Sequence, residues 1–253
     1  MQALAERLGS GLSGLVLSRA DLLGFSSLKT YAPAPESLSG ATLESVHRRG
    51  KFLVFEFGTA GRLALHLSQA GRLDIETPPK KTKPRGAVVR LVFSEDGTPV
   101  GGRPTALLIR EYGTQRKAAW WVLAHGDDGP LTVLGPEPGS DEFAELISTS
   151  DSNRHLSTDL RDQRVVAGIG RGWGDDILHR ARLSPFASLR SLGPEEREAL
   201  LGAVDGVLAD ALDLERTRAG GLSESSLGGR FTVHGHVGDP CPTPGCADTL
   251  RRV

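Results

Sequence analysis

The sequence predicts an α+β protein of more than one domain, in which a β-rich part precedes a helical part. Three observations carry this prediction: short strand-like segments separated by glycine-containing turns, a Pro/Gly-rich link at 134–140, and helical periodicity after that link. A chain of 253 residues can bury more than one core. We therefore expect domains at 1–134, 135–222 and 223–253.

The first residues predict a short amphipathic helix, because Leu4, Leu8 and Leu12 recur at helical spacing. Charged Glu6 and Arg7 lie inside this stretch and exclude a secretory signal. No apolar run approaches the length needed to cross a bilayer, so we expect no membrane partner. Only two cysteines are present, which argues against a disulfide framework and favours a reducing, cytoplasmic setting.

The β-rich part contains several strand candidates. Residues 62–67 alternate cleanly, with Leu63, Leu65 and Leu67 on one face. Many short strands joined by regular turns are typical of a sandwich or a barrel. The other candidate strands are 52–57, 87–93, 106–110, 118–123 and 131–134.

Four helices are predicted after the link. Ser140 or Asp141 is a suitable N-cap for the first of them, and Pro194 suits the first turn of the last. Apolar residues repeat at helical spacing through the last helix, from Leu200 to Leu212. The expected helices cover 141–149, 156–163, 173–181 and 194–213.

The connection before the third of these helices has the residue types of a phosphate-binding turn. Gly168 and Gly170 allow tight backbone turns and the close approach of another molecule. A helix N-terminus presents unpaired N–H groups to an anion, and Arg171 adds a forked cationic donor there. Although the formal net charge is −1, residues 164–190 hold five arginines against two aspartates. An ordinary helix–helix connection remains the alternative interpretation.

Residues 164–185 resemble the helix–two-turn–helix signature of the formamidopyrimidine-DNA glycosylase and endonuclease VIII family. Arg171 stands where that family usually has asparagine, and Gln69 stands where it usually has methionine. Further segments resemble the family in the same order along the chain, at 47–54, 66–73, 110–113, 134–138 and 231–241.

The resemblance implies an N-terminal β-sandwich, a helix–two-turn–helix domain and a partial C-terminal zinc ribbon. It implies a monomeric base-excision-repair enzyme that is both a DNA glycosylase and an abasic-site lyase. Such an enzyme flips an oxidised or abasic nucleotide out of damaged double-stranded DNA. Lys51 would be the catalytic-site lysine. The DNA-binding residues would be His66, Gln69, Arg110, Tyr112, Gly168, Gly170 and Arg171.

Two pieces of the family pattern have no match in this sequence. The family attacks C1′ of the sugar with an N-terminal proline amine assisted by a glutamate, whereas this sequence opens Met1-Gln2-Ala3. Cys241 and Cys246 would supply two of four zinc ligands, with His234 and His236 as alternative partners. We therefore keep three hypotheses open: a fragment of an active glycosylase, a homologue that binds damaged DNA without cutting it, and an unrelated use of the scaffold. The lesion specificity, expected to depend on residues 214–229, stays open as well.

Overall fold

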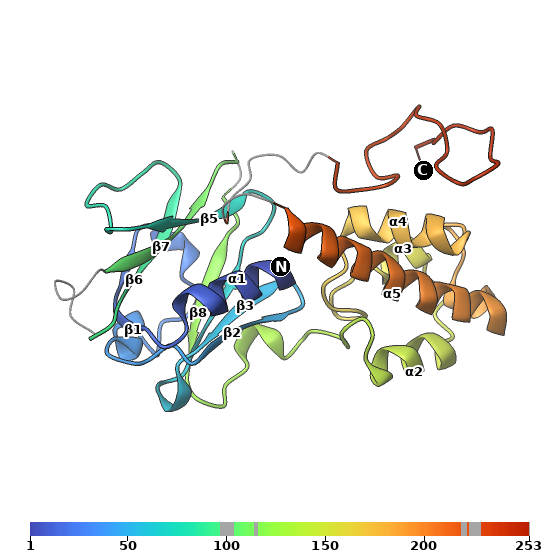
Figure 1. Cartoon of the computed structure of the whole chain (residues 1–253). Helices are drawn as coiled ribbons and strands as arrows, with labels where there is room; N and C mark the ends of the chain where they lie inside the picture. Colours follow the sequence, from blue (N-terminus) through green and yellow to red (C-terminus); the bar gives the residue numbers. More distant parts are fainter. Residues whose placement is uncertain (97–103, 114–115, 219–221, 223–228, 253) are drawn as a thin grey trace. The chain divides into compact units, whose positions relative to one another are not determined.

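The computed structural model describes residues 1–96, 104–113, 116–218, 222 and 229–252. The chain divides into two compact units. The first contains Met1–Thr132 with Ala219–Ser225, and the second contains Val133–Arg218 with Ser226–Val253 (Figure 1). No helix among the described residues is both long and apolar enough to cross a membrane.

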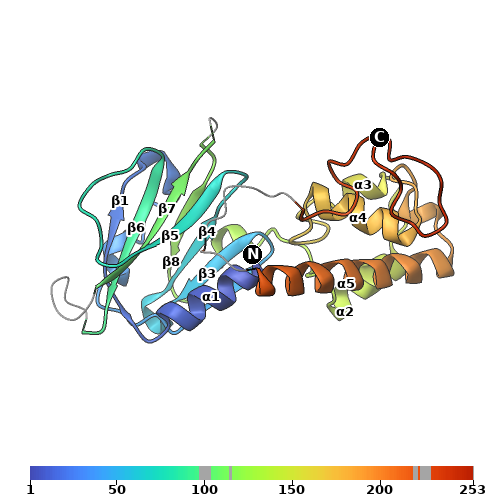
Figure 2. The same ribbon diagram turned by 45° about the horizontal axis from the view of Figure 1, so that its top comes forward.

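The first unit is a sandwich of two antiparallel four-stranded sheets (Figures 1 and 2). One sheet has the order β1-β6-β7-β5 and the other the order β2-β3-β4-β8. The strands are β1 (Val16–Leu22), β2 (Ser45–Arg49), β3 (Phe52–Glu56), β4 (Arg62–His66), β5 (Gly71–Glu76), β6 (Ala87–Ser94), β7 (Thr105–Glu111) and β8 (Ala119–Leu123).

Both sheets and the N-terminal helix share one apolar core. Phe55 and Trp120 from one sheet and Phe93 from the other are fully buried in it. Helix α1 (Gln2–Leu12) adds Leu8 and Leu12, whose helical spacing places both on the buried face. The predicted sandwich and its amphipathic helix are therefore confirmed.

Five of the predicted strands correspond to β3, β4, β6, β7 and β8, whereas the strand predicted at 131–134 is wrong. A 3-10 helix, η4 (Gly129–Leu131), occupies its start instead. Pro130 lacks an N–H for a strand ladder but suits the first turn of a helix. Val133 is 62% exposed, so the apolar run does not form a buried strand.

The second unit is helical, with a C-terminal segment packed against it. Its α-helices are α2 (Asp141–Thr149), α3 (Leu156–Asp159), α4 (Arg171–Ala181) and α5 (Pro194–Thr217). The Ser140 hydroxyl accepts the N–H of Phe143 at 3.2 Å, which is the predicted N-cap of α2. Helix α3 ends at Asp159, four residues earlier than expected. The remaining 3-10 helices are η1 (Phe25–Ser27), η2 (Pro35–Leu38), η3 (Gly58–Ala60) and η5 (Leu189–Ser191).

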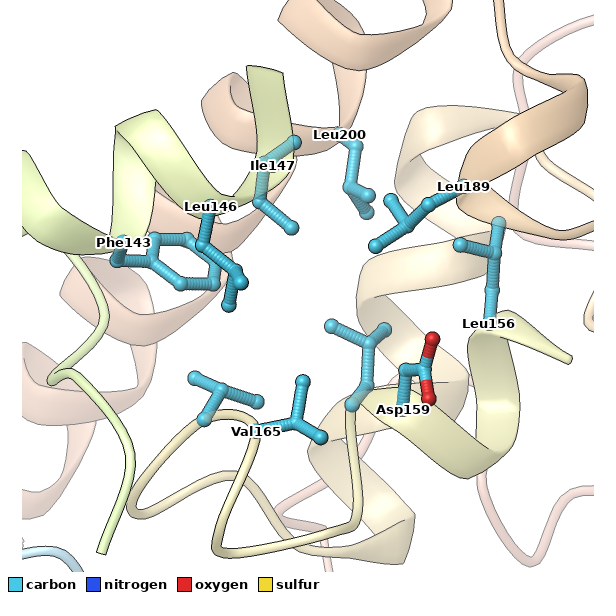
Figure 3. Close-up of a pocket in the computed structure, with 10 residues that line it drawn as sticks. Phe143, Leu146, Ile147, Leu156, Asp159, Val165, Leu189 and Leu200 are labelled. Atoms are coloured by element: carbon cyan, nitrogen blue, oxygen red, sulfur yellow. The ribbon is translucent and has the colours of Figure 1, made fainter. Parts of the chain in front are cut away.

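A small gap lies in the core of the helical unit, among side chains such as Phe143, Ile147 and Leu200 (Figure 3). Its volume is about 10 Å³, which is room for one water molecule at most. Asp159 reaches this apolar core, where its carboxylate accepts the hydroxyl of Ser152 at 2.7 Å. The gap is therefore a feature of core packing and not a ligand site.

The Pro/Gly-rich link is bound to the connection that precedes α4. The N–H of Gly135 donates to the carbonyl of Gln163 at 2.9 Å, and the N–H of Ala167 donates to the carbonyl of Pro136 at 2.9 Å. A Cβ at position 135 would lie 2.6 Å from the Val165 backbone. Glycine is thus required here because two main chains touch.

We predict that Gly135→Ala destabilises the protein by about 1–3 kcal/mol, because a rigid backbone cannot yield to the new methyl group. Chemical denaturation followed by circular dichroism measures the change. Gly202→Ala is the matched control: position 202 lies inside α5 with nothing within 4 Å of an added Cβ. That substitution should stabilise the protein by about 0.5–1 kcal/mol. Equal effects of the two substitutions would contradict the argument.

Candidate nucleic-acid interface

Lys51 occupies a two-residue turn between β2 and β3. Arg49 pairs with Phe52 across the hairpin, so only Gly50 and Lys51 form the loop. Gly50 has φ +56°, the left-handed conformation that two-residue hairpin loops require and that glycine adopts without strain. The strand register therefore places the Lys51 amine at the end of the β2–β3 hairpin.

The Lys51 side chain is partly buried, and burial lowers the pKa of its amine. Within the described part of the chain, no carboxylate pairs with this amine. The positive charge of Lys51 acts electrostatically on His66, at the end of the neighbouring strand β4. Lys51 is thus a cation without a counter-ion beside a second basic group.

His66 packs between its strand partner and the turn that follows it. Its ring centroid lies 5.0 Å from that of Phe52, and its Nδ1 accepts the N–H of Ser68 at 3.3 Å. Burial and then the positive charge of Lys51 lower the pKa of His66. His66 is therefore neutral near pH 7 and supports Ser68, which has a φ of +55°.

The structure brings Gln69, Arg110 and Tyr112 together at the turn between β4 and β5. The N–H of Tyr112 donates to the carbonyl of Ala70 at 3.1 Å, next to Gln69. The Arg110 guanidinium carbon lies 4.3 Å from the centroid of the Tyr112 ring, and its Nε lies 2.9 Å from Oδ2 of Asp74. Tyr112 is 58% exposed. An exposed aromatic ring supported by a paired arginine suits insertion between bases.

In the second unit, the side chain of Gln163 holds the two-turn connection between α3 and α4. Its Oε1 accepts the N–H of Gly168 at 2.9 Å, while its Nε2 donates to the carbonyl of Ile169 at 2.8 Å. Gly168 has φ +96°. The amide thus binds both ends of the Gly168–Ile169 pair, and the positive φ at position 168 is one that glycine adopts without strain.

Helix α4 begins directly after the connection that Gln163 holds. Gly170 is its N-cap, and glycine has no side chain that could cap the first N–H groups. Arg171 is exposed at the first helical position, and no carboxylate in the described part of the chain pairs with it. The arrangement combines uncapped N–H donors with an unpaired guanidinium, which together suit a phosphate group.

Sequence reasoning did not single out Asp176 as a structural anchor. Asp176 is 4% exposed, and its carboxylate accepts three consecutive backbone N–H groups. Those of Thr232 and Val233 lie at 2.7 and 2.9 Å, and that of His234 lies at 3.2 Å. This acid on α4 therefore binds the C-terminal segment through its main chain.

Neighbouring contacts extend this attachment. The Phe231 ring covers Gly172, where an added Cβ would come within 2.4 Å of it, and packs edge-on against Trp173 at 4.7 Å. Asp175 lies 2.6 Å from Nδ1 of His234. The small residue at position 172 is therefore needed where the aromatic ring crosses the first turn of α4.

The two cysteines lie in this same segment. Sγ of Cys241 lies 3.5 Å from Nε2 of His179, and Cys246 is exposed. Hydrogen bonds from the hydroxyl and N–H of Thr243, with further ones from His179 and Cys246, lower the pKa of Cys241 to about 6. The predicted alternative ligands lie elsewhere: His234 is bound to Asp175, and His236 to Asp239 at 2.9 Å.

A structural zinc site needs four ligands. Among the described residues, no three His, Cys, Asp or Glu side chains gather as a metal-holding group. The described residues therefore do not complete a four-ligand zinc site, and no step of the chemistry below depends on one.

Comparison with known proteins places this geometry in a family. The model of the formamidopyrimidine-DNA glycosylase N-terminal domain matches residues 2–101, and that of the family's H2TH domain matches residues 134–221. This chain belongs to the formamidopyrimidine-DNA glycosylase family. The two matched regions contain the β4–β5 turn and the α3–α4 connection, and so most of the candidate site.

Individual relatives agree with this membership. The formamidopyrimidine-DNA glycosylase of Paracoccus denitrificans is 32% identical over 85% of this chain and 79% of its own length. That of Thermus thermophilus is 36% identical over 81% of this chain and 76% of its own length.

Solved structures share the fold. The Thermus thermophilus crystal structure has a TM-score of 0.79 at 29% identity and covers 99% of this chain and 91% of its own. The Lactococcus lactis protein, solved non-covalently bound to DNA containing an abasic site, has a TM-score of 0.82 at 19% identity, with coverage of 99% and 91%. The predicted family and the α+β fold class are therefore confirmed.

We predict that Asp176→Asn loosens the C-terminal segment, because an amide cannot accept all three N–H groups. The loss should amount to about 1–3 kcal/mol, visible as faster hydrogen–deuterium exchange at Thr232, Val233 and His234. Asp210→Asn is the control, since that side chain is 73% exposed in its ion pair with Arg180. No effect of Asp176→Asn on exchange at these three residues would refute this anchoring role.

Proposed function

We propose that the protein is a base-excision-repair DNA glycosylase and abasic-site lyase that acts on damaged double-stranded DNA. Membership of the glycosylase family supports the reaction class. The observation that carries the proposal for this chain is the uncapped N-terminus of α4 with its unpaired Arg171, held in place by Gln163. These groups offer a phosphate both a partial positive charge and hydrogen-bond donors.

The exposed cluster of Gln69, Arg110 and Tyr112 would act on the bases. An enzyme that works on one nucleotide in a duplex must flip it out and fill the gap it leaves. The Tyr112 ring supplies a flat apolar surface, and the Gln69 amide can both donate to and accept from a base edge. The guanidinium of Arg110 lies over the Tyr112 ring, with its carbon 4.3 Å from the ring centroid, and supports the ring by a cation–π contact.

In the family mechanism, excision begins when an amine attacks C1′ of the sugar. The family resemblance assigns this role to an N-terminal amine, whose ordinary pKa of about 8 leaves a useful neutral fraction near pH 7. Lys51 would then contact the phosphate or supply a proton. Zinc and the monomeric state stay predictions, with Cys241 and Cys246 as the expected metal ligands.

The glycosylase proposal is tested by base release. The protein is incubated with duplexes that contain an oxidised purine or an oxidised pyrimidine, and the free base is measured by mass spectrometry. We expect release from at least one of the two. Tight binding to a duplex containing an abasic-site analogue without any base release would instead support a homologue that binds damaged DNA without cutting it.

We predict that Arg171→Ala weakens DNA binding and reduces the slope of log affinity against log salt by about one, because one phosphate contact is lost. Fluorescence anisotropy at several salt concentrations measures both quantities. Arg164→Ala is the control, since the guanidinium of Arg164 is already bound to Asp162 at 3.1 Å. An unchanged salt slope for Arg171→Ala would count against a phosphate contact.

A further inference from the structure

The connection between β5 and β6 carries a concentration of positive charge that the proposed function does not use. Strands β5 and β6 flank β7 and both run antiparallel to it, so the chain crosses over the sheet between Glu76 and Ala87 (Figure 1). This crossover contains no acidic residue. Its lysine and arginine side chains are all exposed, and no carboxylate of the described residues pairs with them: Lys80, Lys81, Lys83 and Arg85.

A buried ion pair fixes the course of this crossover. Nε of Arg90 on β6 lies 2.8 Å from Oε2 of Glu76 at the end of β5, and both side chains are almost fully buried. Arg90 also donates to the carbonyl of Thr82 at 2.8 Å. The Glu76 carboxylate also accepts the N–H of Lys80 at 3.1 Å. Because a buried pair of this kind is costly to open, the crossover is fixed and its cations stay close together.

The crossover lies on the same face of its sheet as Arg110. Residues that pair directly across antiparallel strands share a face, and Arg90 pairs with Leu108, two residues before Arg110 on β7. At the end of the crossover, the carbonyl of Gly86 accepts the N–H of Glu111 at 2.9 Å. The cations therefore lie beside the exposed cluster that would act on the bases, and within the same unit.

This placement favours the DNA backbone as the partner of the crossover. Phosphates attract exposed cations that have no carboxylate of their own, and each contact releases counter-ions from the duplex. An acidic peptide would satisfy the same charges, but it has no reason to lie next to Arg110 and Tyr112. A lysine ammonium group binds phosphate as a point charge and cannot distinguish one base from another.

We propose that residues 80–85 form a second phosphate-binding surface, which binds the backbone of duplex DNA whether or not a lesion is present. The proposal rests on the proposed function, because that function supplies the duplex that these cations meet. The surface would hold the protein on undamaged DNA while successive base pairs pass the cluster of Gln69, Arg110 and Tyr112. Selection of the lesion would be left to the groups that contact bases, since phosphate contacts carry no sequence information.

Fluorescence anisotropy at several salt concentrations tests the proposal on the 253-residue protein. One duplex is undamaged and the other carries a tetrahydrofuran abasic analogue. In a triple variant, Lys80→Gln, Lys81→Gln and Lys83→Gln remove three charges. We expect affinity for both duplexes to fall by the same factor, about tenfold or more, and the slope of log affinity against log salt to fall by about two to three. A loss confined to the analogue duplex, or an unchanged salt slope, overturns the proposal.

A charge-conserving variant shows whether the effect comes from charge. Lys80→Arg, Lys81→Arg and Lys83→Arg together keep all three positive charges, so both affinities and the salt slope should match those of the unmodified protein. A loss as large as that of the glutamine variant would contradict the proposal, because the side chains would then matter for something other than their charge.

A second control separates the position of a charge from the net charge. Lys81→Gln and Lys29→Gln each remove one positive charge. Lys29 is exposed elsewhere in the sandwich, where its Nζ donates to the carbonyl of Ser26 at 2.6 Å. We expect the salt slope to fall by about one for Lys81→Gln and to stay unchanged for Lys29→Gln. Equal salt slopes for these two variants would count against a local surface.

Failure of the proposed function gives a different result from failure of this surface. If the unmodified protein bound both duplexes equally and released no base, the repair reaction would be refuted, whereas an equal loss of both affinities in the glutamine variant would still support the surface. If the unmodified protein released a damaged base and the glutamine variant kept its salt slope, the surface would be refuted and the reaction would stand.

Discussion

A buried carboxylate on α4 organises the helical unit. Asp176 accepts three successive main-chain N–H groups and thereby fixes the segment that crosses the helix. A buried acid is costly unless such donors satisfy it, and peptide N–H groups are costly to bury unless an acceptor meets them. The buried carboxylate and the three N–H groups therefore stabilise one another. The same helix carries Arg171 at its first position, so the order of the segment and the presentation of that cation depend on one element.

The two units position their functional side chains in different ways. In the sandwich, strand register and short turns set the places of Lys51, Gln69 and Tyr112, and the side chains themselves contribute little to the fold. In the helical unit, side chains hold the main chain: Gln163 binds the two-turn connection, and Asp176 binds the C-terminal segment. Substitutions at functional positions of the first unit should therefore change the stability of the protein little. In the second unit, the positions at which substitution lowers stability lie beside the functional residues.

The sequence predicted those parts of the fold in which local pattern and burial agree. Helix α2 was predicted with its observed bounds, because Ser140 caps a regular amphipathic stretch. Strands β1, β2 and β5 were missed because they are edge strands with polar residues, and β1 has a register shift between Leu17 and Arg19. In the site, the family pattern pointed to Arg110 and Tyr112, whose side chains are in contact, and their role on DNA stays a prediction. Asp176 could not be found in this way, since an acid beside Asp175 on a helix is normally solvated and only the tertiary fold brings N–H groups to it.

The two-residue turn at Gly50 and Lys51 has a consequence for how this hairpin can evolve. Side chains alternate between the faces of a strand, so adding or removing a single residue in the turn would rotate β3 and exchange its buried and exposed faces. Replacing Lys51 with another amino acid disturbs no such alternation. Homologous sequences should therefore keep the number of residues between β2 and β3 constant.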